Sequence, residues 1–303
     1  MKALILAAGL GTRIRPFTFF CAKAGIPLLD VPFIRYPLQY LYSRGVREAV
    51  VNLHAHPDSV RAACGTDYRG IRISYSQEPE ILGTAGAMRK AAPMLGDDPF
   101  VVMNSDMLSD IPLVAVLEQH KNLNADITLV IMKDARFANY GGVYFEGSPL
   151  KLSGFRTGTG ESFHYTGLQI VSPHILERIP PEQKTGIFTD IYPQLMKTCR
   201  IYGYLYDGPW KEMGNLREYL RTSVGLIHHS LPVNLQPPGM NPTLISPKAT
   251  IEPGAEVIDS IVMQGACITA GSRVEHSIIG SNVTVSGNLR GTALARGILP
   301  WYF

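Results

Sequence analysis

Two glycines, a threonine and an arginine follow directly on an apolar run near the start of the chain. The run Ala3-Leu4-Ile5-Leu6-Ala7-Ala8 is typical of a buried strand, and Gly9-Leu10-Gly11-Thr12-Arg13 comes next. Closely spaced glycines let backbone N–H groups approach an anion, and an arginine adds a cation. These residues predict a loop that binds a nucleotide triphosphate.

The elements that must position this loop alternate along residues 1 to about 225. Short β-branched runs alternate with helical patterns there, which predicts a Rossmann-like mixed, mostly parallel α/β sheet with helices on both faces. Strands are expected at 3–8, 48–53, 71–75 and 100–104, and further strands, some antiparallel, at 127–132, 142–145 and 167–171. Ligands bind beyond the carboxyl ends of the strands in such sheets.

The composition changes after Leu226. Residues 231–247 hold five prolines and little helical pattern, as a linker would. Beyond it, Ile251, Val257 and Val262 recur 17 residues later as Ile268, Val274 and Ile279, and Val285 opens a third round. This period predicts a short left-handed parallel β-helix of about two and a half coils, with one aliphatic side chain per face pointing inward. The residues from Leu289 to Phe303 break the period and could cap the coil or contact a partner.

The expected organisation is therefore a catalytic domain at 1–230, a proline-rich linker at 231–247 and a β-helix with its tail at 248–303. With 303 residues and 46% hydrophobic residues, the chain can fill a sizeable core. A net charge of +3 without a basic run argues against nucleic acid, and no apolar segment is long enough to span a membrane. The four scattered cysteines lack zinc-ligand spacing, so we expect a cytoplasmic protein with reduced thiols.

A longer string strengthens the prediction for the glycine loop. Gly-x-Gly alone also serves tight turns, but here Thr12-Arg13, Pro16 and Thr18 follow it, and Lys23 stands ten residues after Arg13. The string resembles the signature of the sugar-1-phosphate nucleotidyltransferase family, and within it the mannose-1-phosphate guanylyltransferases. The resemblance implies nucleotide contacts by Leu6, Ala7, Ala8, Gly9, Gly11, Thr12, Gln77, Gly83 and Thr84.

The same resemblance implies catalytic and metal-binding roles. Arg13 would bind the β- and γ-phosphates, and Lys23 would lie between the α-phosphate and the sugar phosphate. Asp106 and Glu212 would hold Mg²⁺ as the cofactor. Glu212 stands where the family usually has aspartate, so it is either a metal ligand with a longer reach or a solvated glutamate beside a core tryptophan.

The sugar side departs from the family. Gly141, Thr166 and Gly167 match positions that line the sugar, where glycine permits close approach. The usual glutamate and lysine of the sugar loop are absent from the segment 154–160, where Arg156 could replace the lysine charge or be solvated. The nucleotide and the sugar stay open at this point.

The resemblance implies transfer of a nucleotidyl group from an NTP to a sugar 1-phosphate, giving an NDP-sugar and pyrophosphate. GTP and mannose 1-phosphate are the first choice of substrates. The alternatives are a uridylyl- or thymidylyltransferase acting on glucose 1-phosphate or another sugar 1-phosphate, and a catalytically weak regulatory paralogue that binds NDP-sugars. We expect a dimer or tetramer assembled through the β-helix.

Overall fold

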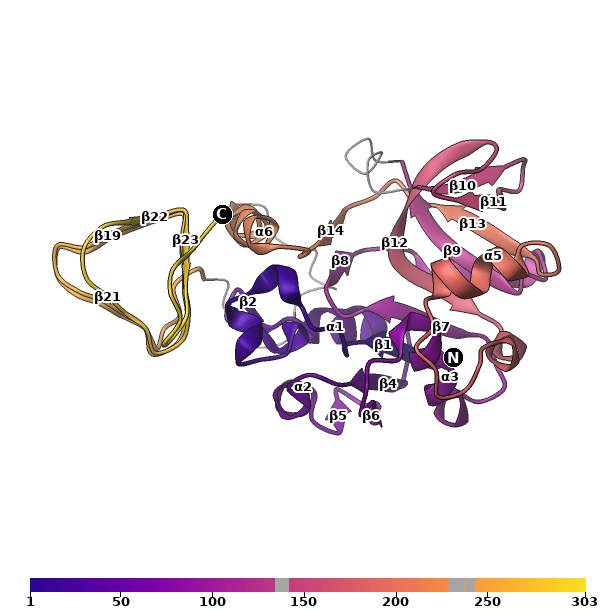
Figure 1. Ribbon diagram of the computed structural model, residues 1–303, viewed down its shortest axis with the longest axis horizontal. Coiled ribbons are helices and arrows are strands. Elements are labelled where there is room, and N and C mark those ends of the chain that lie inside the picture. Colours follow the sequence, from indigo (N-terminus) through magenta and orange to yellow (C-terminus); the bar gives the residue numbers. More distant parts are fainter. Residues whose placement is uncertain (134–141, 229–236, 238–242) are drawn as a thin grey trace.

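The computed structural model describes residues 1–133, 142–228, 237 and 243–303. A large sheet contains β1 (Ala3–Leu6), β4 (Glu48–Leu53), β5 (Asp67–Tyr68), β6 (Ile71–Gln77), β7 (Phe100–Asn104), β9 (Ile127–Met132), β10 (Val143–Glu146), β11 (Lys151–Phe155), β12 (Glu161–Val171) and β13 (Ile201–Leu205). Their order across the sheet is β10-β11-β13-β9-β12-β7-β1-β4-β6-β5. Short stacked strands form the opposite end of the molecule (Figure 1).

The centre of the large sheet is parallel. Strands β7, β1, β4 and β6 run in the same direction. Leu6, Asn52 and Asn104 are therefore in register near the carboxyl ends of their strands. Among the described strands, β5, β11 and β12 run against the others. The expected mixed sheet, with most strands pointing one way, is confirmed. Strand β1 ends at Leu6 rather than Ala8, because the N–H groups of the next two residues bond to a side chain of β4.

Helices cover both faces of the sheet. The described helices are α1 (Arg35–Ser43), α2 (Pro57–Cys64), α3 (Gly83–Leu95), α4 (Leu113–Asn122), α5 (Tyr192–Leu195) and α6 (Leu216–His228). Alternation along β1 sends Ala3 and Ile5 to the core shared with α1, α2 and α4, and Leu4 to the core shared with α3 and α5. Among the described residues, no helix is long and apolar enough to cross a membrane.

The C-terminal strands stack in three parallel ladders. These are β15 (Thr250–Ile251), β18 (Cys267–Ile268) and β21 (Thr284–Val285); β16 (Glu256–Ile258), β19 (Arg273–Glu275) and β22 (Leu289–Arg290); and β17 (Ile261–Val262), β20 (Ile278–Ile279) and β23 (Thr292–Leu294). The first two rounds pair residues 17 apart, as expected, and Val257, Val262, Ile268, Val274 and Ile279 share one inner core. Ile251, which was also expected to point inward, is exposed in the first round.

The third round is more complete than the sequence suggested. Leu289 pairs with Val274 and Ala293 pairs with Ile278, so this round continues with an offset of 15 residues instead of breaking off. Strand β24 (Trp301–Tyr302) then pairs antiparallel with β23 and covers its edge. Of the two roles considered for the tail, capping the coil or contacting a partner, this pairing agrees with the first.

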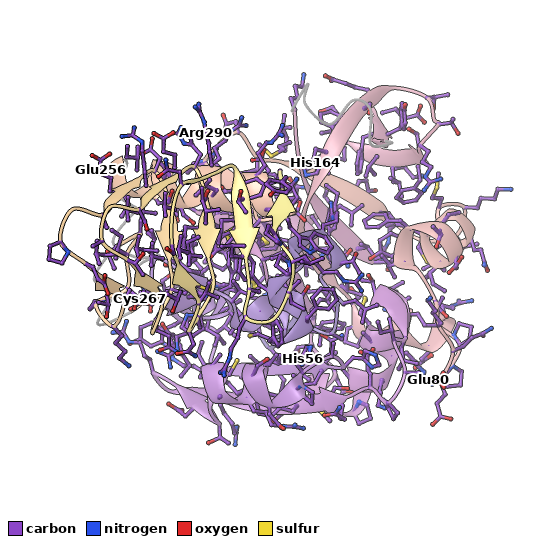
Figure 2. All side chains as sticks on the ribbon, turned by 60° about the vertical axis from the view of Figure 1, so that its left-hand side comes forward. His56, Glu80, His164, Glu256, Cys267 and Arg290 are labelled. Carbon is purple, nitrogen blue, oxygen red and sulfur yellow. The ribbon has the colours of Figure 1, made fainter. Side chains whose placement is uncertain are left out.

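One outer side of the stack carries a charged ladder. Arg273 of β19 pairs with Glu256 of β16 and with Glu275 of its own strand, and Arg290 of β22 pairs with Glu275. Glu256 and Arg290 are labelled on this side in Figure 2, apart from Cys267. The arginine hydrogen bonds and charges lower the pKa of the Glu275 carboxyl, against the opposing effect of desolvation.

A different side of the stack packs against the large unit. Ile261, Met263 and Ile278 share an apolar cluster with Phe17 and with Tyr219 of α6. Phe17 belongs to the 3₁₀ turn Phe17–Phe19, which follows the glycine loop. The stack therefore supports the segment that continues the predicted phosphate loop.

Two further pairs of strands lie outside the large sheet and the stack. They are β2 (Pro27–Leu28) with β3 (Val31–Pro32), and β8 (Met107–Ser109) with β14 (Trp210–Glu212).

Candidate active site

A cavity of about 510 Å³ opens at the carboxyl ends of β7, β1, β4 and β6. Adjacent strands lie about 4.8 Å apart, so these four strands span about 14 Å, enough for an extended nucleotide. The cavity is lined by Leu6, Ala7, Ala8, Gly9, Gly11, Thr12, Arg13, Lys23, Gly83, Thr84, Asp106 and Glu212. The structure thus brings these predicted site residues to one place. Leu10, Asn52, Glu78, Ile81, Asn104, Ser105 and Gly214 also line it.

The glycine loop is held by the residues that follow it in the signature. Gly11 has φ +59°, and a Cβ there would lie 2.8 Å from Cγ2 of Thr18 and 3.1 Å from Cβ of Lys23. The Thr18 hydroxyl donates a hydrogen bond to the Gly11 carbonyl over 2.9 Å. The spacing from Gly11 to Thr18 and Lys23 is therefore a packing requirement, because the chain turns back on itself at the glycine.

Lys23 forms an ion pair with Asp106 across the cavity wall. Both side chains are largely buried, 16% and 11% exposed. Lys23 begins a short 3₁₀ turn, and Asp106 follows β7 by two residues, so two separate segments supply the pair. A cation and a carboxylate thus stand beside the glycine loop.

Glu212 reaches the same wall through a small sheet. Strand β14 pairs antiparallel with β8 and places Glu212 opposite Met107, the neighbour of Asp106. The Met213 N–H donates to the Asp106 carbonyl over 3.2 Å, and the Trp210 indole N–H donates to the Thr166 carbonyl over 2.8 Å. Trp210 thereby anchors β14 to β12, and Glu212 points into the cavity.

The charge environment of Glu212 is that of a crowded carboxylate. Burial raises the pKa of its carboxyl, and the negative charge of Asp106 raises it further. The cations of Lys23 and Arg13 act in the opposite direction. A hard divalent cation would relieve this repulsion.

The donor set fits Mg²⁺. Mg²⁺ is usually held by one or two carboxylates and completes its shell with water and substrate phosphates. Asp106 and Glu212 are two such carboxylates, and no group of three or more potential protein ligands occurs in the described part of the chain. Two carboxylates that face a cavity leave room for such water and phosphate ligands.

The opposite end of the cavity is built by Asn52 of β4 and by Glu78, which follows β6. The Asn52 amide donates to the Glu78 carboxylate over 2.8 Å, and the backbone N–H of Leu82 donates to the other carboxylate oxygen over 3.0 Å. Gln77, which the resemblance placed on the nucleotide, is exposed and accepts a hydrogen bond from Arg61, so the structure does not bring it to the cavity. Strand alternation explains the difference, because neighbouring residues face opposite sides.

Comparison with known proteins identifies the fold and its family. The family model for nucleotidyl transferase matches residues 2–228. The chain belongs to the nucleotidyl transferase family. A probable mannose-1-phosphate guanylyltransferase 2 from Arabidopsis thaliana is 29% identical over 320 residues, covering 100% of this chain and 86% of that protein. A mannose-1-phosphate guanyltransferase from Aspergillus fumigatus is 30% identical over 275 residues, 85% and 73% of the two chains.

Solved structures agree on the fold. HddC from Yersinia pseudotuberculosis superposes with a TM-score of 0.63 at 21% identity, over 73% of this chain and 96% of that one. A putative glucose-1-phosphate thymidylyltransferase from Bacillus anthracis gives a TM-score of 0.67 at 18% identity, over 78% and 98%. Together with the family match, the relatives identify this nucleotidyl transferase as a sugar-1-phosphate nucleotidyltransferase.

Two of the three residues predicted for the sugar, Thr166 and Gly167, lie in β12 next to the cavity wall in this nucleotidyl transferase, but neither lines the cavity. Thr166 is buried, and its hydroxyl donates to the Val130 carbonyl over 2.9 Å. Gly167 has φ +88°, and a Cβ there would lie 2.8 Å from Nδ2 of Asn104. Gly167 therefore lets β12 approach the cavity wall closely, while Thr166 holds β12 to β9. Gly141 lies outside the described residues.

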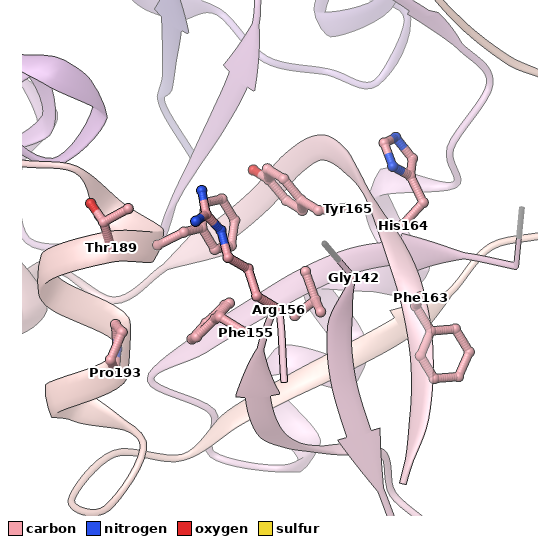
Figure 3. Close-up of a pocket in the computed structure, with 10 residues that line it drawn as sticks. Gly142, Phe155, Arg156, Phe163, His164, Tyr165, Thr189 and Pro193 are labelled. Carbon is pink, nitrogen blue, oxygen red and sulfur yellow. The ribbon is translucent and has the colours of Figure 1, made fainter. Parts of the chain in front are cut away.

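A second cavity of about 550 Å³ lies on the antiparallel side of the sheet. Figure 3 shows Phe155, Phe163 and Tyr165 around it, with the Arg156 side chain pointing in the direction of Tyr165 and Thr189. Arg156 has φ +61° and is exposed. The residue thus stands at the mouth of an aromatic pocket in the segment where the usual glutamate and lysine of the family are absent.

Proposed function

We propose that this sugar-1-phosphate nucleotidyltransferase uses Mg²⁺, GTP and mannose 1-phosphate to make GDP-mannose and pyrophosphate. The proposal rests on one observation: Lys23, Asp106 and Glu212 line the same cavity as the glycine loop. The choice of GTP and mannose follows the curated relatives, which match over most of their length.

The residues of the phosphate end divide the work in the proposed reaction. Backbone N–H groups from Gly9 to Thr12 bind the triphosphate. Arg13 neutralises the charge on the pyrophosphate as it departs. Lys23 lies between the α-phosphate and the sugar phosphate and reduces their repulsion. Asp106 and Glu212 would hold Mg²⁺, which supplies charge neutralisation on the phosphate oxygens when bound.

The chemistry needs no covalent intermediate on the protein. An oxygen of the sugar phosphate forms a bond to the α-phosphorus, the bond to the bridging oxygen breaks, and pyrophosphate leaves with that electron pair. Positioning and charge neutralisation are the contributions that the protein makes to such an in-line transfer. Each charged residue named above serves one of these two purposes.

The test is pyrophosphate release over a matrix of substrates with Mg²⁺. GTP, UTP, dTTP, ATP and CTP are each combined with mannose, glucose, N-acetylglucosamine and heptose 1-phosphates. We expect the strongest release with GTP and mannose 1-phosphate. Stronger release from UTP or dTTP with glucose 1-phosphate would refute the choice of substrates. A blank matrix with nucleotide-sugar binding still detectable would favour the regulatory alternative.

We propose further that residues 1–230 form the catalytic domain and 248–303 a left-handed β-helix through which copies of the chain associate. The three parallel ladders with a repeat of 17 residues support the β-helix. Most of the proposed linker, 231–247, lies outside the described residues. Sedimentation of the intact chain tests the assembly, and a monomer at micromolar concentration would refute it.

A further inference from the structure

A series of hydrogen bonds through two buried side chains joins the two ends of the cavity. The backbone N–H groups of Ala7 and Ala8 donate to Oδ1 of Asn52 over 2.6 and 3.2 Å. Nδ2 of Asn52 donates to Oε1 of Glu78 over 2.8 Å. Oε2 of Glu78 accepts from the N–H of Leu82 over 3.0 Å. Asn52 and Glu78 are 3% and 1% exposed, so both side chains are buried although they border the cavity.

The direction of every bond in this series is fixed by its neighbours. Two backbone N–H groups require an acceptor from Asn52, which leaves its amide nitrogen to face Glu78. The carboxylate can only accept, so it takes one hydrogen bond from that amide and one from Leu82. Turning the Asn52 amide over would set donors against donors and an acceptor against an acceptor. The pair therefore tolerates one arrangement.

The two backbone anchors adjoin the two ends of the predicted nucleotide site. Ala8 directly precedes Gly9 of the phosphate loop, and Leu82 directly precedes Gly83 at the start of α3. Between them lie β1, β4 and β6, neighbours in the sheet. A further contact holds the far anchor, because the Leu82 carbonyl accepts from the Thr185 N–H over 2.8 Å.

We propose that Asn52 and Glu78 are positioning residues that set the spacing between the phosphate loop and the segment at the other end of the nucleotide. This inference rests on the proposed nucleotidyl transfer. An NTP contacts both ends at once, so its binding depends on their spacing, whereas tripolyphosphate contacts the phosphate loop alone. The affinity for the whole nucleotide is thus the property that the pair controls.

Two isosteric substitutions each disrupt this series of hydrogen bonds, one at Glu78 and one at Asn52. Glu78→Gln has one acceptor oxygen for two donors, so it must leave Asn52 or Leu82 facing another donor. Asn52→Asp still accepts from Ala7 and Ala8 but sets two carboxylates against each other. We expect each variant to raise the KM for the NTP about tenfold or more, since an unsatisfied buried polar group is costly.

The double variant Asn52→Asp/Glu78→Gln restores the series of hydrogen bonds, with the donor and acceptor of the bond between the two side chains exchanged. The aspartate accepts from the two loop N–H groups and from the glutamine amide, while the glutamine oxygen accepts from Leu82. All four donors regain an acceptor, and the net charge is unchanged. We expect its KM to lie within about threefold of the unsubstituted enzyme, far from the product of the two single effects.

Two measurements separate positioning from a merely structural role. In Glu78→Gln the phosphate loop keeps its Asn52 anchor, so inhibition by tripolyphosphate should change less than about threefold while the KM for the NTP rises. The matched control is Glu118→Gln/Asn122→Asp, the same exchange on the exposed side of α4, which should alter neither value. Urea denaturation verifies that each variant is folded at the assay temperature.

Several results would overturn the proposal. Single variants with reduced stability and an unchanged KM would show a structural role, and a double variant no better than the poorer single variant would exclude reciprocal bonding. If the unsubstituted protein turns over no NTP, the proposed function fails, and calorimetric GTP affinities of the same four proteins replace KM with the same expected pattern. Absence of nucleotide binding would overturn both proposals.

Discussion

Replacing Lys23 with methionine removes one cation from the cavity wall and leaves the carboxylates of Asp106 and Glu212 there. Methionine preserves the length of the side chain, so the main change is the loss of charge beside Asp106. Breaking a buried ion pair by removing one partner costs about 3–5 kcal/mol. The Lys23 and Asp106 side chains are 16% and 11% exposed and border an open cavity. We therefore expect the lower end, about 3 kcal/mol of unfolding free energy at neutral pH.

The pH dependence of this loss has a definite sign. Burial and Asp106 raise the pKa of Glu212 in the folded protein, and Lys23 is one of the groups that lower it. The Lys23→Met variant therefore has a still higher Glu212 pKa. A carboxyl with a raised folded pKa contributes stability below its unfolded pKa and loses it as the pH rises through the folded value. The deficit of the variant should therefore be larger at neutral pH than at about pH 4.5, the ordinary pKa of a glutamate.

Urea denaturation at both pH values, with and without Mg²⁺, measures this deficit, and pyrophosphate release measures turnover. Mg²⁺ should restore part of the lost stability, because it supplies a cation between the carboxylates. Turnover should fall by at least about 100-fold. The control is Lys2→Met, which breaks an exposed pair with Glu48 and should cost less than about 1 kcal/mol. The reasoning is refuted if Lys23→Met is as stable as the control or keeps turnover within tenfold of the unsubstituted enzyme.

Three further outcomes follow from other contacts. Glu212→Gln should be at least as stable as the unsubstituted enzyme in urea at neutral pH, since it removes repulsion from Asp106. Its turnover should fall by at least about 100-fold. A variant that keeps its turnover would contradict metal binding by Glu212. Gly11→Ala should raise the KM for the NTP about tenfold or more, because its Cβ meets Thr18 and φ is +59°; an unchanged KM would show that the loop adapts. Burial lowers the pKa of His120 to about 4. Protonation of His120 should therefore reduce the unfolding free energy by about 2–3 kcal/mol between pH 7 and pH 4, and His120→Asn should lack this contribution. An equal pH dependence of the unfolding free energy in both proteins would exclude His120 as the cause.

The grouping of residues around the glycine loop could be predicted because these residues are close in sequence. Gly11, Thr18 and Lys23 lie within thirteen residues, and their spacing reflects one local turn of the chain. The repeat of 17 residues was equally accessible, since Ile251 and Ile268 pair directly in the structure. In both cases the sequence separation is itself the structural constraint.

The other end of the site depends on contacts across the sheet. Asn52 and Glu78 are polar residues at the ends of two different strands, and their bond appears only when β4 and β6 lie side by side. Alternation along β6 was an available signal that Glu78, and not Gln77, faces the cavity. Arg156 gave no comparable signal, because its position depends on the turn after β11 rather than on a strand pattern.

The placement of the two tryptophans gives the protein two built-in optical reporters. Trp210 lies two residues before Glu212 and has its ring against His164, with the ring centroids 4.8 Å apart. Trp301 of the C-terminal stack has its ring against Phe19, which follows the glycine loop, at 6.2 Å between centroids. Intrinsic fluorescence therefore samples the strand that carries Glu212 and the turn that follows the glycine loop without any added dye. Replacing either tryptophan with phenylalanine assigns a signal to one of the two regions.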